Sequence, residues 1–197
     1  MIEEKKSIRE VEKTLKGKSD FFISTKEQLN KGIDHIHQLI THAYILFENK
    51  AFSSSVFISI AAIEEVAKLH MGMHIRHSVS TVKKDKLRNH KTKEIIGTNY
   101  TVYMGERIRN AIETKKLEEI FEMSYSGRLK ELREKTIYCE HINEELITPN
   151  DIVDKSLARN ILLFAIESFD DNLVGYTEHS MDVSKQTDIL FEKVAGV

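Results

Sequence analysis

The sequence predicts an all-α protein built around one long apolar helix. Hydrophobic residues recur at helical spacing along nearly the whole chain, and no segment shows the clean alternation that marks a half-buried strand. The 197 residues include only one proline and eight glycines, so few positions interrupt helices. These features together predict a helical bundle with a long central helix and a charged helix at its N-terminus.

The N-terminal part of the chain is expected to contain three helices. A charged segment of about residues 2–17 has apolar side chains at helical spacing, and we treat residues 1–20 as a helical extension of the bundle. Ser24 and Glu27 form the pattern of a capping box, which starts a long amphipathic helix. Residues 51–77 are apolar nearly all round in their first half, as expected of the helix at the centre of a core.

Shorter elements are expected after a polar break at residues 78–86. Helical pieces are predicted at residues 86–103, 105–125 and 127–140. Thr148 and Pro149 then start a further helix, since threonine caps helices and proline is favoured at the first helical position. Residues 181–197 are interpreted as a polar tail, and the length predicts a single domain over residues 1–197.

Composition limits the classes of function. The 29 Lys and Arg nearly balance 31 Asp and Glu, so the molecule as a whole does not attract nucleic acid or an anionic membrane, and any phosphate binding must be local. A single cysteine, Cys139, excludes a disulfide framework and favours a reducing compartment. The first residues lack the apolar core of a signal peptide, and the apolar run at 56–63 is too short to span a bilayer. We expect a cytoplasmic protein that does not bind membranes.

Three charged residues interrupt the apolar central helix, where unpaired charges are costly to bury. They are Glu64, Glu65 and Lys68. One interpretation is a surface ion pair between Glu64 and Lys68, which are four residues apart. The other is a polar site built into the interior of the bundle, where these side chains hold cationic groups in place.

A local cationic segment occupies residues 83–93, which hold six Lys or Arg and one Asp. On a continuous helix, Lys86, His90 and Lys93 lie on one face, where a phosphate group can meet two ammonium groups and an imidazole. Lys91 adds a further candidate for phosphate binding. The alternative interpretation is a charge run that faces only solvent.

A second basic segment combines Arg133, Tyr138 and His141. Arg133 suits stabilisation of a charged phosphorane, Tyr138 can donate a hydrogen bond, and His141 can transfer a proton near neutral pH. The alternative is that the apolar residues of this segment belong to the core and its charges face outward.

Other site chemistries have little support. His70, His74 and His77 lie on one helical face and could bind zinc, but neither a carboxylate nor a thiolate joins them. The chain has no Glu-x-x-His pair of a di-iron bundle, no glycine-rich phosphate loop and no Gly-x-Ser-x-Gly. We therefore expect neither a metal site nor a cofactor.

Three blocks of the sequence, taken together, resemble the AbiV-type abortive infection proteins of the HEPN superfamily. They are residues 51–69, 90–93 and 133–140. The first block, with its Ile-Glu-Glu-x-x-Lys, is the most distinctive; residues 43–49 and the Thr148-Pro149 pair also fit, so the resemblance covers about residues 28–175.

The resemblance implies a HEPN-type helical bundle, usually dimeric, in a bacterial protein that stops the growth of a phage-infected cell. Many HEPN proteins are metal-independent endoribonucleases whose motif is an arginine followed four to six residues later by histidine. This chain departs from that motif, because Tyr138 stands five residues after Arg133 and His141 follows three residues later.

A ribonuclease mechanism follows as a hypothesis. His90 or His141 would take the proton of a ribose 2′-hydroxyl, and Arg133 and Lys93 would stabilise the charge that develops as the phosphodiester is attacked. Tyr138 would orient a phosphate oxygen.

The expected partners are RNA, a second copy of the chain and a phage-encoded activator protein. Two other classes remain open. In one, the protein binds RNA, a nucleotide or a phage protein without cleaving it; in the other, the three polar blocks are only salt bridges between helices.

Overall fold

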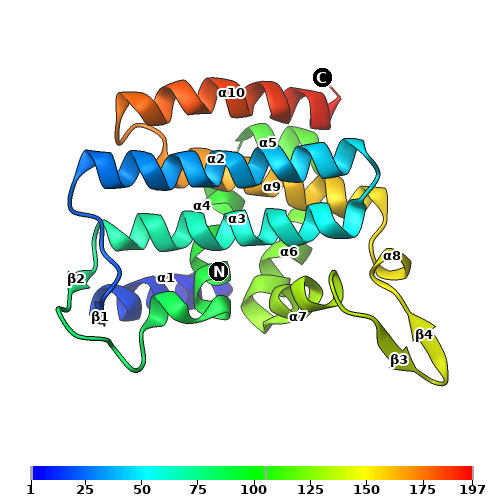
Figure 1. The fold of residues 1–197 in the computed structure, drawn as a ribbon, viewed down its shortest axis with the longest axis horizontal. Helices are drawn as coiled ribbons and strands as arrows, with labels where there is room; N and C mark the ends of the chain where they lie inside the picture. Colours follow the sequence, from blue (N-terminus) through cyan, green and yellow to red (C-terminus); the bar gives the residue numbers. More distant parts are fainter. Residues whose placement is uncertain (1, 105, 197) are drawn as a thin grey trace.

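The computed structural model describes residues 2–104 and 106–196, and it confirms the all-α fold (Figure 1). The helices are α1 (Ile2–Leu15), α2 (Lys26–Glu48), α3 (Phe52–Gly72), α4 (His90–Met104), α5 (Glu106–Ala111), α6 (Thr114–Ser126), α7 (Arg128–Lys135), α8 (Pro149–Ile152), α9 (Lys155–Leu173) and α10 (Glu178–Ala195). The strands are β1 (Lys18–Ser19), parallel to β2 (Arg76–His77), and β3 (Glu140–Ile142), antiparallel to β4 (Glu145–Ile147).

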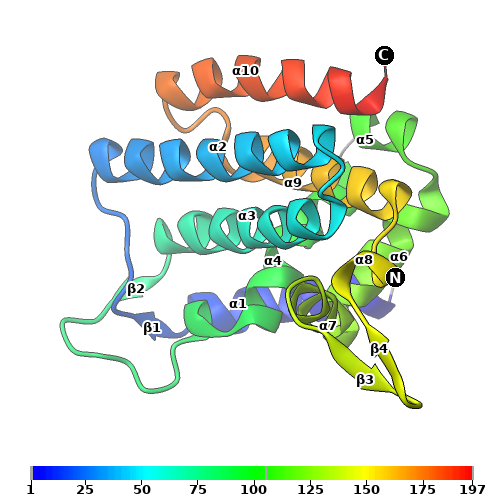
Figure 2. The same cartoon turned by 45° about the vertical axis from the view of Figure 1, so that its right-hand side comes forward.

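Helix α3 is the centre of the bundle. It packs against α2, α4, α7, α8 and α9, while α10 covers α2 and α9 on the outside. In Figures 1 and 2, α2, α3, α9 and α10 run side by side, α1 and α7 lie below α3, and α4 rises from below α3 and passes behind it in Figure 1. A charged side chain that points down from α3 therefore meets α4 and α7 rather than solvent.

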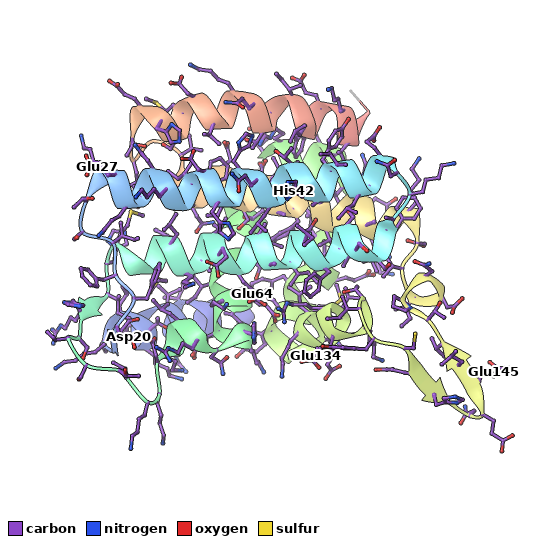
Figure 3. The ribbon with its side chains drawn as sticks, in the orientation of Figure 1. Asp20, Glu27, His42, Glu64, Glu134 and Glu145 are labelled. Carbon is purple, nitrogen blue, oxygen red and sulfur yellow. The ribbon has the colours of Figure 1, made fainter. Side chains whose placement is uncertain are left out.

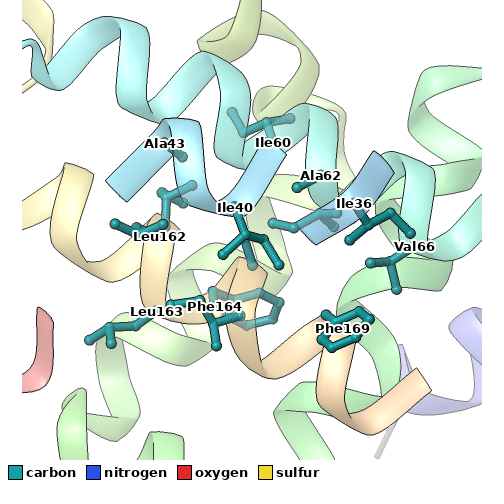
Figure 4. Packing of buried hydrophobic residues seen from close by; sticks show 14 of the residues in the cluster. Ile36, Ile40, Ala43, Ile60, Ala62, Val66, Leu162, Leu163, Phe164 and Phe169 are labelled. Carbon is teal, nitrogen blue, oxygen red and sulfur yellow. The ribbon is translucent and has the colours of Figure 1, made fainter. Parts of the chain in front are cut away.

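The core lies between α2, α3 and α9. Figure 4 shows Ile36 and Ile40 of α2 against Ile60 of α3 and Phe164 and Phe169 of α9, all fully or nearly fully buried. Each such side chain contributes about 1.5–3 kcal/mol relative to exposure to water. This packing explains why α3 is apolar on almost every face, and it fixes the helix that presents Glu64.

Several element boundaries differ from the sequence-based expectations. Helix α3 ends at Gly72 instead of residue 77, because Arg76 and His77 form a short strand with residues 18 and 19. The helix expected at 127–140 ends at Lys135 and is followed by the β3–β4 hairpin.

The last two helices also differ from expectation. Pro149 starts α8 as expected, but Asp154 caps a separate helix, α9, with its side chain accepting from the amide of Leu157 at 2.7 Å. The expected polar tail is wrong, because residues 178–195 form α10, whose Val183 and Phe191 are buried against the bundle.

Gly97 sets how closely α4 approaches α3. A Cβ at this position would lie 2.6 Å from the carbonyl oxygen of Ile63, a backbone atom that cannot move away. The Ser168 hydroxyl also donates to the Gly97 carbonyl at 2.7 Å, which fixes α4 from the side of α9. The close approach matters for the site because α4 carries His90 and Lys93 on the same face.

We expect Gly97→Ala to lower the free energy of unfolding by about 2 kcal/mol, because overpacking against backbone outweighs the roughly 1 kcal/mol of helix propensity that alanine gains. Urea unfolding measures this change. Gly32→Ala is the matched control, since the atoms nearest to its Cβ belong to the Leu69 side chain, which can rotate, and not to backbone. Equal stability of the two variants would contradict the role of Gly97.

Candidate functional site

The buried carboxylate of Glu64 lies close to three cationic or titratable side chains, which come from two other helices. Its Oε2 lies 2.7 Å from the His90 Nδ1 and 2.8 Å from the Lys93 Nζ. Its Oε1 lies 3.8 Å from the Arg133 Nε. We call Glu64, His90, Lys93 and Arg133 the Glu64 centre. Figure 3 shows Glu64 on the side of α3 that faces the lower part of the molecule.

Each member of the centre is held by its helix. His90 and Lys93 lie three residues apart in the first turn of α4, which begins after Asn89, whose side-chain oxygen accepts from the amide of Thr92 at 2.9 Å. Arg133 lies in the last turn of α7, with its guanidinium 5.0 Å from the ring centroid of Phe57 of α3. The arrangement therefore depends on how α3, α4 and α7 pack.

The centre opens to solvent at His90. The Lys93 side chain is only 8% exposed, whereas that of His90 is 38% exposed. An ionised carboxylate only accepts hydrogen bonds, so the His90 Nδ1 must carry the hydrogen that faces Glu64. In the neutral ring the lone pair is then on Nε2, the nitrogen that does not face Glu64. The Nε2 of His90 can therefore accept a proton from a bound molecule.

Glu94 is a second acid beside the centre, and its charge is suppressed. It is fully buried, and neither carboxyl oxygen has a side-chain hydrogen-bond partner within the described part of the chain. Burial, and then the charge of Glu64, raise the pKa of Glu94 to about 8, against the smaller opposing effects of Arg133, the backbone amide of Lys130 and Lys93. At neutral pH Glu94 is mostly uncharged, so Glu64 is the described carboxylate that balances the two basic side chains, Lys93 and Arg133.

Glu65 and Lys68 do not join the Glu64 centre. They pair with each other, with the Lys68 Nζ 3.2 Å from the Glu65 Oε2, and both side chains are partly exposed. The Lys68 ammonium lies 4.7 Å from the ring centroid of Phe21. The expected pair between Glu64 and Lys68 is wrong, because Glu64 points to α4 and α7 while Lys68 points to the segment before α2.

The predicted helical face of Lys86, His90 and Lys93 is also wrong. Lys86 lies in a separate 3-10 turn, Lys86–Arg88, and Asn89 separates this turn from α4. The Lys86 Nζ bonds the Glu10 carboxylate of α1 at 2.5 Å. Lys91 is exposed and lies beside Gly127, at the corner between α6 and α7, so it faces away from Glu64.

Tyr138 and His141 lie outside the centre. Tyr138 follows α7 and is 64% exposed, and His141 is exposed on β3. Figures 1 and 2 show the β3–β4 hairpin projecting from the end of the molecule, beyond α7 and α8. The structure therefore does not bring these two residues together with Arg133, although all three are close in sequence.

The histidine row on α3 has other contacts. The His70 Nδ1 lies 3.1 Å from the Asn172 Oδ1, and the Nε2 atoms of His70 and His74 lie 3.4 and 3.5 Å from the Tyr176 hydroxyl. His77 instead stacks on Phe22. Among the side chains that the structure describes, no three of His, Cys, Asp or Glu are grouped as metal ligands would be.

Sequence reasoning missed Glu94 and Phe57. A signal for Glu94 was present: residues 90, 93, 94 and 97 follow the i, i+3, i+4, i+7 spacing of one helical face, and Gly97 on that face marks a close helix contact. Phe57 had no such signal, because an aromatic residue in an apolar helix indicates only core packing.

Comparisons with known proteins give one result. A family model for the AbiV proteins of the HEPN group matches residues 25–169. No curated protein and no solved structure matches the chain. Among the described helices, none has both the length and the apolar character needed to cross a bilayer.

Proposed function

Because the chain belongs to the AbiV family of HEPN abortive-infection proteins, we propose that it is a metal-independent endoribonuclease that arrests growth of the infected cell. The observation that carries this proposal is the hydrogen bond from the His90 Nδ1 to the buried Glu64, beside Arg133 and Lys93. A carboxylate that fixes an imidazole, next to groups that bind a phosphate, is the arrangement that general-base cleavage of RNA requires.

The reaction uses the ribose as its own nucleophile. The His90 Nε2 takes the proton of a 2′-hydroxyl, and the 2′ oxygen forms a bond to the adjacent phosphorus. The bond from that phosphorus to the 5′ oxygen of the next nucleotide breaks, and the leaving oxygen takes a proton from water. The products are a 2′,3′-cyclic phosphate and a 5′-hydroxyl.

Each remaining member of the centre has a role that follows from its position. Arg133 presents a planar guanidinium that suits two phosphate oxygens at once, and it stabilises the added negative charge as the phosphorane forms. Lys93 is almost fully buried, so its role is to add positive charge close to the phosphate and to keep Glu64 in position through their ion pair. Glu64 keeps the His90 ring in one orientation.

The test compares RNA cleavage by the purified wild-type protein with cleavage by His90→Ala. Loss of a general base lowers the rate by about 10²–10⁴-fold, and we expect wild-type products to end in a 2′,3′-cyclic phosphate. His42→Ala is the matched control, because it removes an exposed imidazole from α2 (Figure 3). Cleavage that persists in His90→Ala with the same termini would contradict the proposed base.

A second candidate function is RNA binding without cleavage, and one observation favours it. Neither Tyr138 nor His141 lies beside His90, so among the described residues the centre has one exposed imidazole and no second one. In this case growth arrest follows from sequestration of RNA. Wild-type protein would then bind RNA tightly, Arg133→Ala would weaken binding, and no cyclic phosphate ends would form.

A further inference from the structure

A cavity of about 410 Å³ lies where α1 meets the N-terminal end of α4 and the end of α6. Arg9 and Lys13 of α1 line one side, and Lys91 and Tyr125 line the other. None of these four residues belongs to the Glu64 centre. Helix α1 also lies outside residues 25–169, which match the AbiV family model.

The cavity has a surplus of positive charge. Arg9, Lys13 and Lys91 face it, and among the described side chains that line it the only acidic one is Glu10. That carboxylate is already engaged, since its Oε1 lies 2.5 Å from the Lys86 Nζ and its Oε2 lies 3.7 Å from the Lys13 Nζ. Lys91 forms neither an ion pair nor a hydrogen bond with any other described side chain. Lys13 thus has a partner in Glu10, and Arg9 lies close enough to Glu12 to lower the pKa of that carboxyl, so the cation that an entering anion meets without an acidic partner among the described side chains is Lys91.

The wall beside these cations is partly apolar. Tyr125 and Ile95 line the cavity, and the Tyr125 ring supplies a flat surface of the kind on which a base stacks. Cations next to an aromatic ring, in a cavity of this volume, match the two parts of a nucleotide: a phosphate and a base. A simple inorganic anion would leave the apolar wall unused.

The cavity adjoins the Glu64 centre through the first turn of α4. Asn89 and Lys91, which line the cavity, are the immediate neighbours of His90 in the chain. One strand can therefore contact both places. We propose that this cavity binds one nucleotide of an RNA strand next to the bond that is presented to His90. This inference rests on the proposed RNA substrate and adds the place at which the RNA strand binds.

The test measures binding of a short 2′-O-methyl RNA, which lacks the nucleophile and stays intact, by fluorescence anisotropy at several salt concentrations. We expect Lys91→Glu and Arg9→Glu each to weaken binding at least 10-fold. Loss of one phosphate contact lowers the slope of log affinity against log salt by about 0.7 for a single strand. Both side chains are exposed, so the charge reversals leave the fold intact.

Lys31→Glu is the control, because it reverses an exposed charge on α2, away from the cavity. Unchanged RNA affinity in both Lys91→Glu and Arg9→Glu overturns the inference. A second outcome also overturns it: Lys91→Glu abolishes binding of AMP but leaves RNA affinity unchanged. The cavity would then bind a free nucleotide and not an RNA strand.

Failure of the cavity inference and failure of the nuclease proposal give different experimental results. If the wild-type protein cuts no RNA but the 2′-O-methyl strand binds and Lys91→Glu loses it, the cavity inference stands and the nuclease proposal fails. If His90-dependent cleavage is present and Lys91→Glu binds RNA normally, only the cavity inference fails.

Discussion

Glu64→Gln is expected to lower the free energy of unfolding by about 3 kcal/mol and to abolish RNA cleavage. The substitution keeps the volume of the side chain but removes the one carboxylate that pairs with Lys93 among the described residues, and Lys93 is almost fully buried. Removing one partner of a buried ion pair costs about 3–5 kcal/mol, because the other charge remains buried without compensation. The same change loosens the orientation of the His90 ring, which Glu64 fixes through a 2.7 Å hydrogen bond.

The neighbouring residue supplies the matched control. Glu65→Gln makes the same chemical change one position along α3, but the Glu65–Lys68 pair is partly exposed. Partly exposed pairs contribute about 1 kcal/mol or less, so Glu65→Gln should unfold near the wild-type urea midpoint and retain cleavage. A Glu64→Gln protein as stable as Glu65→Gln would show that Glu64 does not organise buried charge.

Glu94→Gln is expected to make the protein more stable than wild type at alkaline pH. Burial raises the pKa of Glu94 to about 8, so the folded protein keeps a proton there that the unfolded chain releases near pH 4.5. Between these values the folded state binds more protons than the unfolded state. Stability conferred by protonated Glu94 is therefore complete below about pH 4.5 and is lost as pH rises through about 8, at up to about 1.4 kcal/mol per pH unit.

Glutamine imitates the neutral form at every pH, so the stability difference between Glu94→Gln and wild type should grow from pH 5 to about pH 8 and level off above it. Urea unfolding at a series of pH values measures it. Glu118→Gln removes a carboxylate from an exposed position on α6 and serves as the control. A constant difference between Glu94→Gln and wild type would mean that Glu94 is charged in the folded protein at neutral pH.

Much of the fold follows from local pattern. The apolar character of α3 on nearly all faces predicted its central position, and the Thr148–Pro149 pair predicted the start of a helix, because these signals act over a few residues. The β3–β4 hairpin was missed for a local reason. Its turn residues, Asn143 and Glu144, both have positive φ, and Glu144 is not a residue type that usually marks such turns. Helix α10 was missed because its buried residues are sparse among polar ones.

The candidate site was only partly predictable. Glu64, His90, Lys93 and Arg133 were each identified as unusual charged residues, but their meeting point depends on how three helices pack, and no spacing in the sequence encodes that. Continuous helices were assumed through Lys86 and through Tyr138, and both assumptions placed residues at the site that the structure locates elsewhere. Breaks at Asn89 and after Lys135 account for both errors.

A double-mutant cycle between Glu64 and Lys93 tests the organising role of Glu64 most directly. Unfolding free energies are measured for wild type, Glu64→Gln, Lys93→Met and the double variant. If Glu64 and Lys93 form a buried pair, the double variant loses at least about 1 kcal/mol less than the sum of the two single losses, since no unpaired charge remains. Simple additivity of the two losses would contradict the account, because the two side chains would then not act as one unit.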